Sequence, residues 1–230
     1  EARRRWAVRF STPELYQESV KGYYRLITGI DRQVGRIREE LDRLKLSSNT
    51  IIIYTSDNGF YLSEHGLAGK WFMHEESIRT PLIVNDPRLP AARRDARHSA
   101  IALNIDMAPT ILDMAGVAPP PSMQGRSIVP LVEGRGVKWR EDIFYEHHFD
   151  NGWIPPTEGV RNSRYKYTIY TGEPTVTEEL YDLEVDMHEE TNLARDPRFA
   201  SRLAELRARR QSWLRHLDRW HPGQAWKDPD

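Results

Sequence analysis

The stretch that decides the fold is NTIIIYTSDNGFYLSEHGLAGK, which runs from Asn49 to Lys70. Its apolar run Ile51–Tyr54 is typical of a short strand in a sheet that helices cover on both faces. Ligands of open α/β sheets bind beyond the carboxyl ends of the strands. The polar residues that follow therefore indicate either an ordinary turn and loop or a site for a charged ligand: Asp57, Asn58, Glu64, His65 and Lys70.

The composition limits the class of protein. The 230 residues are 39% hydrophobic and 29% charged, as in a globular rather than a disordered chain. There are 33 Lys and Arg residues against 34 Asp and Glu, so no overall charge points to nucleic acid or to an anionic membrane. No apolar run approaches the roughly 20 residues of a membrane span, and the first residues lack a signal-peptide core. The compartment stays open.

Capping residues and periodicity predict the elements around this stretch. Thr12-Pro13-Glu14 is a helix start, because it combines a capping hydroxyl, a proline at the first helical position and an acid at the positive end. Apolar residues three or four apart continue this helix from Leu15 to Leu44. TPLIVNDP (Thr80–Pro87) predicts a second short strand, and LPAARRDARH an exposed basic loop.

The second half of the chain reads as an α+β unit. We expect Asp106 to cap a short helix that Gly116 ends, followed by a proline-rich connector, VAPPPSMQGRS. DIFYEHHF, RYKYTIY and EELYDLE predict a small antiparallel sheet. A final helix over Pro197–Leu217 has many arginines on one face and an apolar face of Leu203, Leu206, Trp213 and Leu217. The order predicts an α/β fold with an α+β appendage, divided into 1–118 and 119–230.

The polar residues after the first strand have chemical and ordinary interpretations. Asp57 and Asn58 offer the hard oxygen ligands that Ca²⁺ prefers, although such an ion takes about six to eight. Lys70 can place a positive charge on an anion, and His65 can donate to it or exchange a proton with a leaving group. Taken singly, Asp-Asn-Gly is more often a turn, and a lone histidine or lysine is more often a solvated loop residue.

Order and spacing favour the chemical interpretation. YTSDNGFYLSEHGLAGKWFMHEESIRTPLIV resembles the downstream signature of the sulfatase family, within the alkaline-phosphatase-like superfamily. NIDMAPTILDMAGVAPPPSMQGRS, RNSRYKYTIY and EELYDLEVDMHEETNLA are similar to later segments of the same family, in family order. The resemblance covers about Tyr24 to Ala194. It implies the C-terminal part of a sulfatase fold: the end of a catalytic α/β domain with a mixed sheet flanked by helices, then a small antiparallel sheet with a C-terminal helix.

The resemblance also implies roles for single residues. Asp57 and Asn58 match two ligands of one divalent metal, normally Ca²⁺, which upstream residues complete. Lys70 matches the lysine that contacts the sulfate group of a sulfate-ester substrate, and His65 lies at the pocket edge, where it implies a catalytic or substrate contact. Three further residues match positions that organise the loop: Glu75, Glu76 and Arg79.

The sequence departs from the family pattern in one large respect. The family nucleophile is a formylglycine made from the first residue of an upstream C-x-P-x-R or S-x-P-x-R motif, and its hydrate attacks sulfur. This sequence has no cysteine, and its near miss, STPEL, has Leu15 where the motif needs arginine. His74 stands where relatives often have tyrosine. The chain is therefore expected to be inactive without an upstream segment.

Three hypotheses follow from these observations. The first is a sulfatase, a sulfuric ester hydrolase; the second is a phosphate or phosphonate ester hydrolase of the same superfamily, in which a histidine often replaces Asn58. The third is an inactive sulfatase-like fragment or interaction module. We also expect the two strands near the metal ligands to expose apolar faces, which would allow self-association. EHHFDNGWIPPTEG, with its histidines and Trp153, suits either a pocket rim or ordinary packing.

Overall fold

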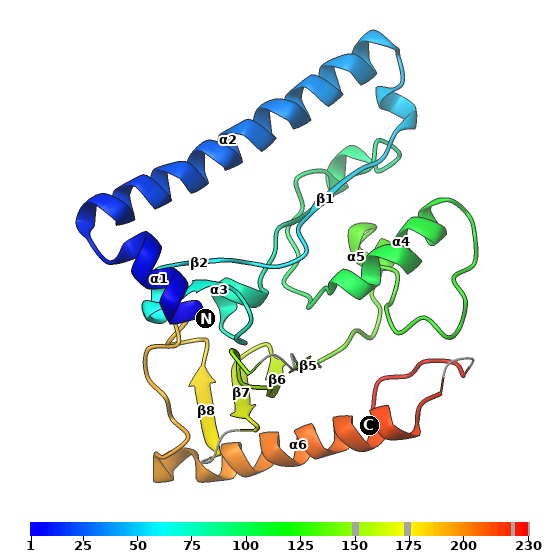
Figure 1. Cartoon of the computed structure of the whole chain (residues 1–230). Coiled ribbons are helices and arrows are strands. Elements are labelled where there is room, and N and C mark those ends of the chain that lie inside the picture. The colour runs from blue at the N-terminus through cyan, green and yellow to red at the C-terminus, as the bar shows by residue number, and fades with distance from the viewer. Residues whose placement is uncertain (149–151, 173–175, 222–223, 230) are drawn as a thin grey trace. The chain divides into compact units, whose positions relative to one another are not determined.

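The computed structural model describes residues 1–148, 152–172, 176–221 and 224–229. Contacts divide the chain into two compact units, Glu1–Ala91 and Ala92–Asp230, whose elements are labelled in Figure 1. The expected division at residues 118 and 119 stays a prediction. The α/β class and the small antiparallel sheet with its C-terminal helix are confirmed. No helix within these described ranges is long and apolar enough to cross a membrane.

Two helices begin the first unit. The sequence did not predict the first, α1 (Ala2–Phe10). The second, α2 (Pro13–Arg43), begins as predicted, since the Thr12 hydroxyl accepts a hydrogen bond from the Leu15 amide at 3.3 Å. The side chain of Trp6 in α1 donates to Ser63 Oγ at 2.8 Å, which ties α1 to a loop of the site described below.

Two small antiparallel pairs follow these helices. Strands β1 (Ile52–Thr55) and β4 (Leu82–Asn85) pair so that Ile52 lies opposite Asn85. The remaining elements are short: the hairpin strands β2 (Tyr61–Leu62) and β3 (Ala68–Gly69), the 3-10 turns η1 (Ser47–Asn49) and η2 (Glu64–Gly66), and helix α3 (Glu75–Ile78). Both predicted strands exist, each within two residues of the predicted position.

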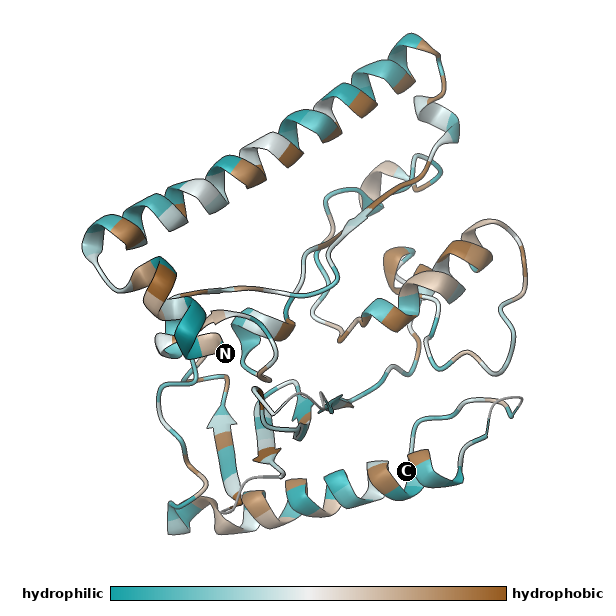
Figure 2. Ribbon diagram, viewed as in Figure 1, coloured by the Kyte–Doolittle hydropathy of each residue, from teal (hydrophilic) through white to brown (hydrophobic). Residues whose placement is uncertain are grey.

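Apolar side chains of the first unit are exposed. None of the described residues of α2 is buried, although its 31 residues carry the predicted apolar stripe, visible as brown bands in Figure 2. Leu26 is 70% exposed and Ile83 in β4 is 60% exposed. The expected exposure of the strands is therefore confirmed, whereas cover on both faces is not found within this unit. Self-association through this surface stays a prediction.

The second unit is built on a four-stranded antiparallel sheet in the order β5-β6-β7-β8. Before it come the 3-10 turns η3 and η4 and two short helices, and after it a 3-10 turn, η5, and one long helix. The elements are η3 (Ala91–Arg93), η4 (Asn104–Asp106), α4 (Met107–Met114), α5 (Val129–Val132), β5 (Asp142–His147), β6 (Thr157–Asn162), β7 (Tyr165–Tyr170), β8 (Thr177–Asp182), η5 (Pro197–Phe199) and α6 (Ala200–Arg219).

Strand β6 is the element of this unit that the sequence missed. The segment EHHFDNGWIPPTEG, which suits either a pocket rim or ordinary packing, ends within β6, and its residues 149–151 lie outside the described residues. Thr157 to Val160 are buried in the sheet, although Glu158 and Gly159 disfavour a strand by propensity. Pairing on both sides, with β5 and β7, outweighs that local preference.

Helix α6 packs on the sheet through the predicted apolar face. Leu203, Leu206 and Trp213 form one core with residues of the strands: Val160, Tyr167 and Leu180. Each such side chain contributes about 1.5–3 kcal/mol when it leaves water. The arginines are not simply solvated, because several pair with acidic residues of the strands. They are Arg207 with Glu178, Arg209 with Asp142, and Arg210 with Glu158.

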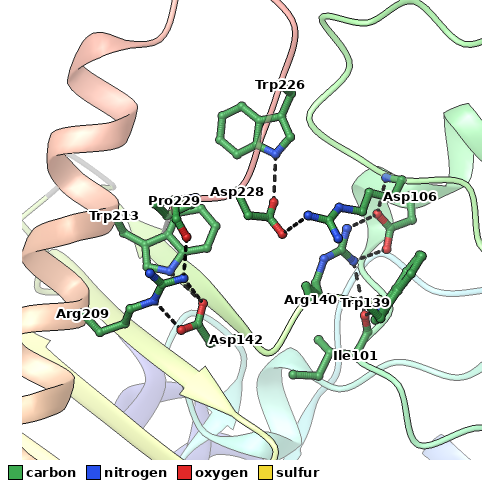
Figure 3. Close-up of polar contacts among 11 residues, drawn as sticks. Ile101, Asp106, Trp139, Arg140, Asp142, Arg209, Trp213, Trp226, Asp228 and Pro229 are labelled. Atoms are coloured by element: carbon green, nitrogen blue, oxygen red, sulfur yellow. Dashed lines mark hydrogen bonds and ion pairs between the residues drawn. The ribbon is translucent and has the colours of Figure 1, made fainter. Parts of the chain in front are cut away.

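Asp106 has a larger role than the predicted helix cap. It stands at the N-cap position of α4, but its carboxylate makes no capping bond to that helix. It accepts hydrogen bonds from the Leu103 and Arg126 amides, both at 2.8 Å. Arg140 also binds it through two nitrogens at 2.5 and 2.7 Å, and both side chains are almost fully buried (Figure 3). This ion pair joins two segments that lie 34 residues apart in the sequence.

The last described residues cross the second unit as a strap (residues 224–229, Figure 3). The Trp226 amide donates to the Pro121 carbonyl at 2.8 Å, and Asp228 pairs with Arg126 at 2.5 Å. Arg209 donates to the Pro229 carbonyl at 3.0 Å while it pairs with Asp142. The strap thus links the segment before α5 to the helix α6.

The buried ion pair makes a stability prediction. Arg140→Ala leaves the Asp106 carboxylate buried without its charged partner, which should lower the free energy of unfolding by about 3–5 kcal/mol. Arg198→Ala is the control, because Arg198 is exposed beside Asp196 and its loss should cost about 1 kcal/mol or less. Urea denaturation of both variants measures the difference. Equal losses of unfolding free energy in the two variants would contradict the stabilising role of the buried Asp106–Arg140 ion pair.

A second prediction concerns pH. Hydrogen bonds from the Arg164 guanidinium hold the pKa of Asp182 below its ordinary value, although burial opposes the shift. A carboxyl whose pKa is lower in the folded state stabilises the fold above its unfolded pKa, and that contribution is lost as pH falls through the folded pKa. The stability difference between the wild type and Asp182→Asn should therefore be larger at pH 7 than at pH 3. Urea denaturation of both proteins at the two pH values measures this, and an equal difference at pH 7 and pH 3 would contradict the role of Asp182.

Candidate active site

The turn after β1 carries the two predicted metal ligands. Asp57 is exposed, and its Oδ1 accepts a hydrogen bond from the Asn58 amide at 2.9 Å and from Ser56 Oγ at 3.4 Å. The Asn58 side-chain amide donates to the Gly59 carbonyl at 2.7 Å. That bond fixes the orientation of the Asn58 amide group, so its oxygen is available to a cation.

Gly59 allows this turn to lie directly on helix α3. Its amide donates to the Ser77 carbonyl at 2.8 Å. A Cβ atom at this position would lie 2.0 Å from the Glu76 carbonyl oxygen and 2.8 Å from that of Arg79. No side chain fits at such distances from backbone atoms, so the position requires glycine.

Lys70 reaches the turn from the end of the hairpin β2–β3. Its Nζ donates to Asn58 Oδ1 at 2.5 Å. Gly69 has a φ of +99°, and a Cβ at Gly69 would lie only 2.8 Å from the Trp71 ring. The Arg5 guanidinium of α1 stacks on Trp71 at 4.7 Å from the ring centroid. The structure thus brings together three of the four predicted site residues, Asp57, Asn58 and Lys70.

His65 lies in the loop of the same hairpin, within a different set of contacts. Its Nε2 is 3.4 Å from Glu76 Oε2, and its ring stacks on that of His74 with the centroids 4.0 Å apart. Burial would raise the pKa of Glu76, but the interaction with His65 and with the backbone together hold it below its ordinary value. Glu76 therefore stays ionised beside the His65 imidazole.

The residues present could supply part of a metal site. Across the described part of the chain, no group of three or more His, Cys, Asp or Glu side chains could hold an ion. Asp57 and Asn58 offer a carboxylate and an amide oxygen, which are the hard donors of Ca²⁺. The amide oxygen already faces a cation, the Lys70 ammonium. The donor set therefore fits a hard divalent cation, but it supplies only two of about six to eight ligands.

Sequence reasoning missed the residues that hold this site together. Tyr61, fully buried, has its hydroxyl 2.7 Å from His74 Nδ1, and neither residue entered the predicted site. Ser77 contributes only its backbone carbonyl, so no side-chain signal could have revealed it. Glu75 and Glu76, which the resemblance expected to organise the loop, form the first turn of α3.

The comparisons with known proteins place the chain in a family. The sulfatase family model matches residues 2–117, and a model described as N-sulphoglucosamine sulphohydrolase, C-terminal, matches residues 63–215. The chain is 35% identical over 198 residues to the N-acetylglucosamine-6-O-sulfatase of Bacteroides thetaiotaomicron, a match covering 83% of this chain and 35% of that protein. The chain belongs to the sulfatase family, within the alkaline-phosphatase-like superfamily.

Solved structures agree with the family and with the fold. A protein solved in complex with its substrate, D-glucosamine-2-N,6-O-disulfate, matches with a TM-score of 0.82 and 32% identity over 90% of this chain and 42% of that chain. The phosphonate monoester hydrolase of Agrobacterium radiobacter matches with a TM-score of 0.74 and 29% identity over 86% of this chain and 43% of that chain. This chain thus spans less than half the length of these relatives.

The close approach at Gly59 gives a third prediction. Gly59→Ala should push the turn away from α3 and lower the free energy of unfolding by about 1–3 kcal/mol, as overpacking does. Gly35→Ala is the matched control, because a Cβ there meets open space and alanine favours a helix by up to about 1 kcal/mol. Urea denaturation should thus show a lower free energy of unfolding in Gly59→Ala and a higher one in Gly35→Ala. Similar changes in the two variants would refute the packing argument.

Proposed function

We propose that this chain supplies one part of a sulfatase active site, and that the protein containing it hydrolyses a sulfate ester. The observation that supports the proposal is the contact between Lys70 Nζ and Asn58 Oδ1, directly beside the Asp57 carboxylate at the end of β1. A lysine and two hard oxygen donors at one strand end suit an anionic group that a metal ion also binds. Sulfate has the charge and the oxygens for that position.

In this proposal Asp57 and Asn58 hold one divalent metal, normally Ca²⁺, together with ligands from outside these 230 residues. When bound, the metal would polarise the sulfuryl oxygens as a Lewis acid. Lys70 binds a sulfuryl oxygen and stabilises the charge that grows there during the reaction. His65, with Glu76 beside it, donates a proton or a hydrogen bond to the substrate.

The nucleophile is proposed to come from elsewhere in the complete protein. The sequence has no cysteine from which formylglycine could form. A formylglycine hydrate would supply the attack on sulfur that releases the alcohol. The residues of this chain then act only on binding, orientation and charge, so the 230 residues by themselves are expected to be inactive and to bind Ca²⁺ weakly.

A phosphonate or phosphate ester is the second candidate substrate class. The matching phosphonate monoester hydrolase structure favours it, and so does the 35% identity over 214 residues to a multifunctional alkaline phosphatase superfamily protein of Trinickia caryophylli. Asn58 favours the sulfatase, because its amide oxygen suits Ca²⁺. The phosphate and phosphonate ester hydrolases often have a histidine at this position, and an imidazole nitrogen suits transition metals. Turnover of 4-nitrophenyl sulfate against that of phenyl 4-nitrophenylphosphonate separates the two candidates.

The fourth prediction tests the site. In the complete protein, Lys70→Ala should lower kcat for 4-nitrophenyl sulfate by about 10²–10³, because one preorganised charge contact of the transition state is lost. Lys21→Ala is the matched control, since Lys21 is exposed on α2 and should change kcat little. Steady-state kinetics measure both. Wild-type kcat in Lys70→Ala would exclude the proposed role of Lys70.

A further inference from the structure

The hairpin β2–β3 and the helix α3 meet in a cluster of four polar side chains. Tyr61 begins the hairpin, His65 lies in its loop, and His74 and Glu76 belong to the start of α3. His74 is only 7% exposed and Tyr61 is fully buried. Two imidazoles, a phenol and a carboxylate thus share one largely buried space, and Tyr61 and His74 have no role in the proposed function.

The loop that carries His65 has an unfavourable backbone conformation. His65 has a φ of +56° and Ser63 a φ of +99°, both in the left-handed region that favours glycine. Such residues cost of order 1 kcal/mol or more each and persist only where their surroundings hold them. The side-chain contacts of His65 must therefore help to fix its position.

His74 provides one of these contacts. Its ring lies nearly parallel to that of His65, with 4.0 Å between centroids and 15° between planes. Its Nδ1 is 2.7 Å from the Tyr61 hydroxyl, so the ring is itself anchored to the hairpin. Tyr61 presents its edge to both imidazoles, at 6.1 and 5.8 Å. His74 thus sits between the fixed strand β2 and the strained loop.

The same elements position the proposed binding groups. His74 is the N-cap residue of α3, and α3 supports the turn of Asp57 and Asn58 through Gly59. Lys70 directly follows β3, the second strand of the hairpin. A shift of the hairpin against α3 would therefore move Lys70 and His65 relative to Asn58.

We propose that His74 is a positioning residue, which fixes the His65 imidazole, and with it the hairpin that carries Lys70, through its ring stack on His65 and its hydrogen bond with Tyr61. The inference rests on the proposed function for its effect on catalysis. The effect on the His65 ring does not depend on that function. His74→Ala removes both contacts, His74→Phe keeps the stack, and Tyr61→Phe removes only the hydrogen bond.

The first measurement is independent of activity. In the complete protein labelled at histidine, the His65 Hε1 signal, assigned with His65→Gln, should carry an upfield shift from the neighbouring ring. The shift should be lost in His74→Ala and retained in His74→Phe, with no change in His98→Ala, which alters an exposed loop. A His65 signal that is the same in the wild type and in His74→Ala would overturn the proposal.

The second measurement uses kinetics with 4-nitrophenyl sulfate. His74→Ala should lower kcat by about tenfold to a hundredfold with little change in KM, as expected when a reacting group is misplaced by about 1 Å. Tyr61→Phe combined with His74→Phe should restore most of kcat, since both partners of the buried hydrogen bond are then apolar. Unchanged kcat in His74→Ala would overturn the positioning role of His74. So would losses of kcat that run parallel to losses of thermal stability across all the variants. An inactive wild type would instead refute the proposed function, and the His65 signal would still decide the role of His74.

Discussion

The absence of a side chain at Gly59 is the constraint on which the site depends. It allows the turn after β1 to lie against the backbone carbonyls of α3, with the Gly59 amide bonded to the Ser77 carbonyl. Because α3 also carries Glu76 and starts at His74, the strand end, the helix and the hairpin loop become one packed unit. Side chains as far apart in the sequence as Asn58 and Lys70, which are separated by 12 residues, are then held in contact.

The charges within this unit agree with the anionic ligand of the proposed function. A carbonyl oxygen has two lone pairs, so Asn58 Oδ1 can accept from Lys70 and still coordinate a metal ion. A lysine and a divalent cation so close together repel each other, and the single Asp57 carboxylate offsets only part of that repulsion. A sulfate group between them would neutralise the excess positive charge. The positive charge of the proposed site thus matches the negative charge of the proposed substrate.

The sequence predicted what local patterns encode and missed what distant contacts decide. The Thr12 cap, the long helix, the end of α4 at Gly116 and three strands of the sheet are local in origin, so they could be predicted. Strand β6 depends on its neighbours, and the Arg-rich α1 lacks a clear apolar period. The partner of Asp106 lies 34 residues away, and the Tyr61–His74 contact joins two elements, so neither had a signal in the sequence. The predicted roles of Asp57, Asn58, Lys70 and His65 stay proposals, because they concern a ligand.

The exposed stripe of α2 and the proposed metal site, to which this chain offers two ligands, raise the same physical question. A 31-residue helix gains most of its stability from burying an apolar face, yet none of the described residues of α2 is buried. A hard divalent cation likewise needs about six to eight oxygen ligands, of which Asp57 and Asn58 are two. The apolar face of α2 is not buried within its unit, and Asp57 and Asn58 do not complete a coordination shell. Under the proposed function, residues outside Glu1–Ala91 would cover the apolar face of α2, and residues outside this chain would supply the remaining metal ligands.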